Sequence, residues 1–183
     1  TRDDLPDGGA GHFAATIHAI RRENPAASVE VLIPDFKGER PALQQVIDAA
    51  PDVINHNVET VPRLYSAVRP QAAYQQSLAL IKNVSLAGNP KRIITKSGIM
   101  LGLGETKDEV VGVMEDLLNA GCRLLTLGQY LRPSPEHHPV MEYVHPDTFD
   151  ELSDIGKRLG FDRVVAGPLV RSSYHAAESF SSV

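Results

Sequence analysis

The sequence has one cysteine, no long hydrophobic run and no excess of basic residues. Because Cys122 has no partner for an internal disulfide, the sequence is typical of a reducing compartment, and we expect a small buried thiol. No apolar stretch approaches the roughly 18 residues that cross a bilayer. Residues 1–11 are acidic and rich in glycine and proline, unlike a signal peptide. These absences predict a soluble cytoplasmic protein without a membrane partner.

The charge pattern gives no support for a nucleic-acid partner. The formal net charge is −5, and no run rich in lysine or arginine is present. A phosphate backbone is bound through clustered positive charge, so the pattern argues against nucleic acid. The histidines form no His-x-His or His-Glu-x-x-His spacing, which argues against a metal centre built on histidine alone.

What the sequence does contain is an alternation of strand and helix patterns. Runs rich in β-branched or apolar residues predict strands at 29–34, 53–57, 92–100, 123–130 and 163–167. Segments with helical spacing lie between them. Thr106 is the expected N-cap of one helix, and Asp147 or Thr148 is expected to open the last. Parallel strands need such crossovers, so the sequence predicts one α/β domain with a parallel sheet.

Polar and glycine residues follow the carboxyl end of each predicted strand. They include Asp35, Lys37, His56, Asn57, Glu59, Gly102, Glu105, Gln129, Arg132 and Arg171. In parallel α/β folds, ligands bind beyond the carboxyl ends of the strands, where loops vary and helix N-termini offer free N–H groups. We therefore expect an active site at this edge of the sheet.

Two of these segments have more than one interpretation. Asn57 and Glu59 can form a fork for a ribose diol, which needs both a donor and an acceptor, or they can cap a helix that starts near Thr60. From the residues alone, the ribose interpretation and the capping interpretation are equally supported. Glycines at 98, 102 and 104 indicate a close backbone approach, and their spacing matches neither a phosphate loop nor a dinucleotide fingerprint.

Three motifs together resemble those of the lipoyl synthases, radical S-adenosylmethionine (SAM) enzymes that insert sulfur into a protein-bound octanoyl chain. The motifs are Asn55-His56-Asn57-Val58-Glu59-Thr60, Gly102-Leu103-Gly104-Glu105-Thr106 and Arg171-Ser172-Ser173-Tyr174-His175-Ala176. The resemblance runs from Asp3 to Phe180. It implies a partial TIM-like (β/α) barrel of the radical SAM type over residues 1–168, with the first strands missing, and a C-terminal tail at 169–183 that carries the Arg-Ser-Ser-Tyr motif.

The resemblance also implies roles for individual residues. Asn57 and Glu59 would hold the ribose of SAM, while Arg69 would pair with the methionine carboxylate. Asp7-Gly8-Gly9 resembles the loop that receives the methionine ammonium, although here the acid precedes the glycines. The adenosine would lie against Ser97, Gly98, Met100 and Gly102. Ser172 or Ser173 would complete the coordination of an auxiliary cluster, with Arg171 lowering the cost of the alkoxide charge.

Implied cofactors are SAM and two 4Fe-4S clusters, and implied partners are an octanoylated lipoyl-carrier domain and an electron donor such as ferredoxin or flavodoxin. A nucleoside radical would remove hydrogen from C6 and C8 of the octanoyl group, and sulfur would be inserted there. Clusters need several cysteine thiolates, and this chain has one. We therefore expect a C-terminal portion that is inactive alone.

Two other functions remain open from the residues. Lys96, which we place at a strand end, is a candidate Schiff-base lysine of an aldolase-like barrel. Alternatively, the chain is a non-catalytic α/β domain whose edge only binds a nucleoside-like molecule. Trapping of a carbonyl substrate on Lys96 would favour the first, and binding without turnover would favour the second.

Overall fold

A computed structural model describes residues 5–87 and 93–173 of the chain. It contains one parallel sheet in which the strands lie side by side in chain order. These strands are β1 (Glu30–Leu32), β2 (Val53–Asn55), β3 (Ile94–Leu101), β4 (Leu124–Gln129) and β5 (Arg163–Gly167). Each falls within or overlaps a predicted run, and each pairs in parallel with its neighbours. The predicted α/β class with a parallel sheet is confirmed.

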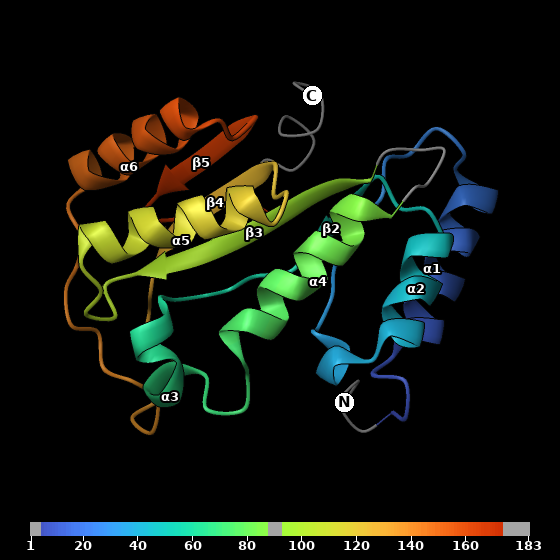
Figure 1. Ribbon diagram of the computed structural model, residues 1–183, viewed down its shortest axis with the longest axis horizontal. Coiled ribbons are helices and arrows are strands. Elements are labelled where there is room, and N and C mark those ends of the chain that lie inside the picture. Colours follow the sequence, from blue (N-terminus) through green and yellow to red (C-terminus); the bar gives the residue numbers. More distant parts are fainter. Residues whose placement is uncertain (1–4, 88–92, 174–183) are drawn as a thin grey trace.

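Helices supply the crossovers between these strands. They are α1 (Ala10–Glu23), α2 (Arg40–Asp48), α3 (Tyr65–Val68), α4 (Tyr74–Leu86), α5 (Lys107–Asn119) and α6 (Pro146–Leu159), with short 3-10 turns η2 (Phe36–Gly38) and η3 (Pro62–Leu64). In Figure 1, α4 and α5 lie in front of the sheet, α6 lies beside β5, and α1 and α2 pack together. No helix of the described residues is both long and apolar enough to cross a membrane.

In the part of the chain that the structure describes, the helices cover one face of the sheet. A doubly wound sheet reverses its strand order so that helices reach both faces, whereas here the order never reverses. The main core accordingly joins helix residues such as Ile17 and Met114 to alternate strand residues such as Ile54, Ile99 and Leu127. One-sided helices over five sequential parallel strands are the arrangement of a partial TIM-like barrel.

The other face of the sheet corresponds to the inside of that barrel. It carries a small apolar cluster of Val53, Ile94 and Leu124 at the amino ends of the strands. Above it lies Lys96, which is 1% exposed and donates to Glu30 Oε1 at 2.8 Å and Oε2 at 3.1 Å. On this face, the Lys96–Glu30 pair therefore follows the apolar cluster in the direction of the carboxyl ends of the strands.

The predicted ends of two helices have different outcomes. Thr106 is the N-cap of α5, as the sequence predicts, and it also forms a capping box with Glu109. The predicted start of α6 at Asp147 or Thr148 is wrong, because His145 is the N-cap and its Nδ1 accepts from the Asp147 N–H at 3.3 Å. The cap acceptor here is a histidine nitrogen, whereas most N-caps use a carboxylate or hydroxyl oxygen.

Candidate functional site

Two adjoining cavities open at the carboxyl edge of the sheet. The larger, of about 410 Å³, is lined by Leu32, Ile33, Pro34, Asp35, His56, Asn57, Glu59, Arg69, Pro70, Gln71 and Ala72. The smaller, of about 300 Å³, is lined by Leu32, Asn57, Glu59, Gly98, Ile99, Met100, Thr126, Gly128, Gln129, Leu131, Val170, Arg171 and Ser172. Residues in or directly after all five strands contribute to this second cavity. Asn57 and Glu59 belong to both.

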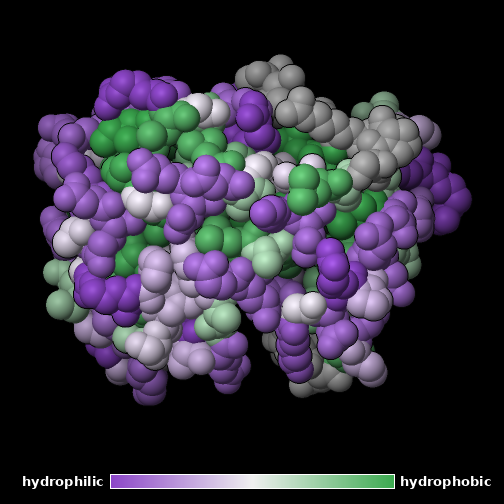
Figure 2. Space-filling model, viewed as in Figure 1, coloured by the Kyte–Doolittle hydropathy of each residue, from purple (hydrophilic) through white to green (hydrophobic). Residues whose placement is uncertain are grey.

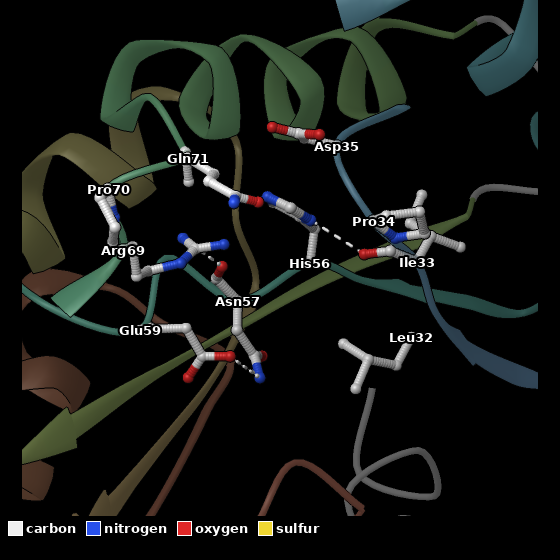
Figure 3. A pocket seen from close by; sticks show the side chains of 11 residues that line it. Leu32, Ile33, Pro34, Asp35, His56, Asn57, Glu59, Arg69, Pro70 and Gln71 are labelled. Atoms are coloured by element: carbon white, nitrogen blue, oxygen red, sulfur yellow. Dashed lines mark hydrogen bonds between the residues drawn. The ribbon is translucent and has the colours of Figure 1, made fainter. Parts of the chain in front are cut away.

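The larger cavity lies between the end of β1 and the segment that joins α3 to α4. The space-filling view has a notch at its lower edge, between the parts of the molecule that carry this segment and η2 (Figure 2). Figure 3 shows Arg69, Asn57 and Glu59 along one wall, with His56 and Ile33 opposite. His56 is buried between the Ile33 carbonyl and Ser77 Oγ, each 2.9 Å from a ring nitrogen. This histidine holds the wall in place.

The Asn57–Glu59 fork exists and is fixed to β3. Asn57 Nδ2 donates to Glu59 Oε1 at 3.1 Å, and both side chains face the cavities. The Glu59 N–H donates to the Gly98 carbonyl at 2.9 Å, and the Met100 N–H donates to the Glu59 carbonyl at 2.7 Å. Glu59 has a φ of 66°, in the left-handed region. The capping interpretation is wrong, because the next helical turn, η3, begins after Val61 and has no side-chain cap.

The electrostatics of the fork are set by burial. Desolvation raises the pKa of Glu59 above its ordinary value, although the Asn57 hydrogen bond and the Arg69 charge act in the opposite direction. Arg69 Nη1 donates to the Val58 carbonyl at 3.1 Å and to the Tyr65 hydroxyl at 3.2 Å. The guanidinium is thus anchored beside the fork, where it offers positive charge to the larger cavity.

Glycines keep the floor of the smaller cavity open. A Cβ at Gly98 would lie 2.8 Å from Thr126 Oγ1 and 2.9 Å from Asn57 Oδ1, too close for either. Met100 lines the same cavity. The close approach that the glycine spacing predicts is therefore present at Gly98, where a flat ring could lie against the strand.

Other predicted residues lie outside these two cavities. Ser97 points to the helix side, is fully buried and accepts from the Val58 N–H at 3.3 Å. Gly102 has a φ of 93°, and its carbonyl accepts from Met141 N–H, so it holds the loop after β4. Alternation along β3 explains the position of Ser97, because neighbouring residues of a strand face opposite sides. Gly102 lies beyond the end of β3, where the backbone has already turned away.

Asp7-Gly8-Gly9 begins α1 rather than lining either large cavity. The Asp7 carboxylate accepts from Gly9 N–H at 2.9 Å and Gly11 N–H at 2.8 Å. These hydrogen bonds, with that of Gly11 the stronger, lower the pKa of Asp7. Gly8 lines a small neighbouring cavity together with Pro34 and Asp35, which also line the larger one. The role of this loop towards an ammonium group stays a prediction.

Lys96 is not at a strand end. It is the third residue of β3 and its amino group is paired with Glu30 inside the barrel face. It lines neither cavity. The aldolase-like interpretation is therefore wrong, because a Schiff-base lysine must reach a carbonyl substrate in a cavity.

The C-terminal motif is brought to the site only in part. Arg171 and Ser172 line the smaller cavity, and Asn57 Nδ2 donates to Ser172 Oγ at 2.9 Å. Ser173 is exposed, and Tyr174 lies outside the described residues. The fork and the tail, 115 residues apart in sequence, thus meet at one atom pair.

The described residues contain no cluster of three or more His, Cys, Asp or Glu that could hold a metal. Cys122 is fully buried, and desolvation raises its thiol pKa to about 12, opposed by hydrogen bonding to Leu124. The expected buried thiol is confirmed. Such a thiol is a poor ligand, because metals bind the thiolate.

Some residues that shape the smaller cavity were not predicted from the sequence, among them Thr126, Gly128 and Val170. Thr126 and Val170 read as ordinary strand and tail residues, and nothing in the sequence marks them. Gly128 has a signal, since a glycine inside a strand indicates a close approach. A Cβ there would collide with the Val170 carbonyl.

Comparison with known proteins identifies relatives along almost the whole chain. The profile of the Radical SAM superfamily matches residues 1–117. "Lipoyl synthase" of Caldanaerobacter subterraneus subsp. tengcongensis is 58% identical over 96% of this chain and 61% of its own length. "Lipoyl synthase" of Nitratidesulfovibrio vulgaris is 54% identical over 100% of this chain and 60% of its own length. The chain thus spans about three fifths of these curated relatives.

Among solved structures, a radical S-adenosylmethionine methyltransferase, TsrM, from Kitasatospora setae is similar to 80% of this chain and 28% of its own. The TM-score is 0.47 and the sequence identity is 13%. That structure holds cobalamin and a 4Fe-4S cluster.

Proposed function

We propose, from the premise that the chain belongs to the Radical SAM superfamily, that it forms the SAM-binding wall of a lipoyl synthase. One observation carries the proposal. Asn57, Glu59, Gly98, Met100 and Ser172, which the family resemblance selects, line a single cavity at the carboxyl ends of the strands. Curated lipoyl synthases at 54–58% identity over almost the whole chain support the same assignment.

The fork fits the sugar of a nucleoside. Asn57 Oδ1 is buried and has no hydrogen-bond partner among the described residues, and Glu59 faces both cavities. A ribose diol would supply hydroxyl donors to these oxygens, and an unpaired buried acceptor costs free energy until it has such a partner. Arg69 would pair with the methionine carboxylate from the larger cavity, and Gly98 would let the adenine approach β3.

The residues of this chain fit the 4Fe-4S clusters less well than they fit SAM. The described residues supply no set of thiolates, so the cysteines must come from outside these 183 residues. Within this chain, the candidate ligands are the hydroxyls of Ser172 and Ser173, and Arg171 lies beside them. When bound, SAM and the two 4Fe-4S clusters would supply the hydrogen abstraction at C6 and C8 of an octanoyl group and the inserted sulfur.

We also propose the protein partners and the cellular location. An octanoylated lipoyl-carrier domain would be the protein substrate, and ferredoxin or flavodoxin would be the reductant. A cytoplasmic location belongs to the proposal, because thiols and reduced clusters persist in a reducing compartment.

Turnover on a carrier domain tests this function. An octanoylated carrier is incubated with SAM, reductant and this chain, joined to the cysteine-bearing region of a lipoyl synthase relative and loaded with iron and sulfide. Mass spectrometry should show two sulfur atoms replacing two hydrogens, and the 183-residue chain alone should give none. Sulfur insertion by the chain alone, or none by the loaded fusion, would contradict the proposal.

The non-catalytic interpretation predicts SAM binding to the chain and no sulfur insertion by the loaded fusion. The same experiment therefore separates the two functions.

A further inference from the structure

Val170, Arg171 and Ser172, near the end of the described residues, line the smaller cavity. β5 ends at Gly167, and the Val170 N–H donates back to the Gly167 carbonyl at 3.1 Å, which turns the chain towards β4. Val170 is 6% exposed and lines the cavity. We call residues 168–173 the strap.

The strap rests directly on β4. A side chain at Gly128 would collide with the carbonyl of Val170, so the close approach depends on this glycine. Arg171 Nη1 donates to the Val170 carbonyl at 2.7 Å and reaches the Gln129 carbonyl at 3.5 Å. These contacts hold the strap over β4 and direct Ser172 towards β2.

Ser172 ties the strap to the fork. The Asn57 amide nitrogen donates to Ser172 Oγ at 2.9 Å and to Glu59 Oε1 at 3.1 Å, so both of its hydrogens are used. We call the Asn57–Ser172 hydrogen bond the latch. With the latch closed, Asn57 is 9% exposed and its Oδ1 has no partner among the described residues.

We propose that Ser172 is a positioning residue whose hydroxyl holds the place of a sugar hydroxyl on Asn57, so that a nucleoside entering the fork opens the latch and frees the strap. The inference rests on the proposed function, because the nucleoside is its ligand. A diol oxygen that accepts from Asn57 Nδ2 uses the same N–H that Ser172 now occupies, so the two acceptors compete for it. By linkage, ligand binding destabilises the latch by the same free energy by which the latch lowers the affinity for the ligand.

Opening of the latch also affects the end of the strap, at Ser172 and Ser173. Ser172 and Ser173 are adjacent, so release of the first from Asn57 frees both hydroxyls to move. The Ser172 hydroxyl therefore leaves Asn57 only when the nucleoside is in place.

The test uses the 183-residue chain as wild type and as Ser172→Ala, Ser172→Thr and Ser173→Ala, with SAM as the probe. Amide hydrogen exchange of the strap without ligand measures the latch itself. We expect faster exchange in Ser172→Ala, and wild-type exchange in Ser172→Thr, which keeps the hydroxyl, and in Ser173→Ala. Gly128→Ala should also speed exchange, because it displaces the strap without changing the fork.

Calorimetric titration with SAM measures the competition. Loss of one competing neutral hydrogen bond should tighten SAM binding about two- to tenfold in Ser172→Ala. The affinity should be unchanged in Ser172→Thr and Ser173→Ala. SAM should also speed strap exchange in wild type but not in Ser172→Ala. A purely structural role for Ser172 would leave the affinity unchanged or weaken it.

The outcomes separate this inference from the proposed function. The latch is overturned if Ser172→Ala exchanges no faster than wild type, even where SAM binds normally. The competition is overturned if SAM protects the strap, or if Ser172→Ala binds SAM no tighter. If no variant binds SAM, the competition fails, whatever the strap does, and sulfur insertion by the loaded fusion decides the proposed function separately.

Discussion

At the residue scale, Glu59 combines two features that are unfavourable for folding. Its carboxylate is largely removed from water, which raises its pKa, and its backbone lies in the left-handed region at a φ of 66°. Strain and buried charge of this kind concentrate at functional sites, where the surrounding structure maintains them. Asn57 and Arg69 offset the burial only in part.

Replacing this carboxylate should stabilise the fold. A raised folded-state pKa means that the protonated form is favoured in the native state, so stability falls as the pH rises through that pKa. Glu59→Gln imitates the protonated form. We expect a higher Tm than wild type at neutral pH, with a difference that shrinks as the pH falls from the raised pKa towards the ordinary carboxyl pKa of 4.5.

Thermal denaturation over a pH series measures this effect, with Glu115→Gln on the exposed side of α5 as the matched control. The control should follow wild type at every pH. A Glu59→Gln protein that is less stable than wild type at neutral pH would contradict the account of the fork.

At the element scale, β3 connects the barrel interior to the site. Its alternate residues Lys96, Gly98 and Met100 face the inside of the barrel, and Lys96 reaches past β2 to Glu30 on β1. The sequence shows a lysine in an apolar run but not its partner, which lies 66 residues earlier. The interpretation of Lys96 as a catalytic amine failed for this reason.

Removing one partner of this ion pair should destabilise the protein strongly. Glu30→Gln leaves the ammonium of Lys96 buried without its carboxylate, and we expect a loss of about 3 kcal/mol in the free energy of unfolding. The double variant Glu30→Met with Lys96→Met should recover most of it, because no buried charge remains.

Urea denaturation gives both values, with Glu115→Gln again as the control. A cost for Glu30→Gln within about 0.5 kcal/mol of that control would show that the pair contributes little.

Elements themselves were largely predictable. Runs rich in β-branched or apolar residues place all five strands, and Thr106 is the N-cap of α5 as expected, where it also forms a capping box with Glu109. The start of α6 was not predictable, because His145 caps through an imidazole nitrogen next to two residues that cap more often. Such local choices depend on geometry that a sequence pattern does not contain.

At the scale of the whole molecule, topology predicts where the site lies but not which residues line it. Parallel strands send their carboxyl ends to one edge, so Asn57, Glu59 and Arg171 could be expected together. Strand register then decides between neighbours, bringing Gly98 to the cavity and Ser97 to the helix side. The contact of Asn57 with Ser172 depends on how the strap crosses β4, which no local pattern encodes.

The central claim is that the Asn57–Glu59 fork binds the sugar of SAM, and calorimetric titration of SAM into the 183-residue chain tests it most directly. Wild type, Asn57→Ala and Glu59→Ala are compared, with Glu115→Ala as the control. The account predicts that Glu115→Ala binds as wild type does and that each fork variant loses about tenfold or more in affinity, the worth of a hydrogen bond to a charged group. Equal affinity in all four proteins would contradict it.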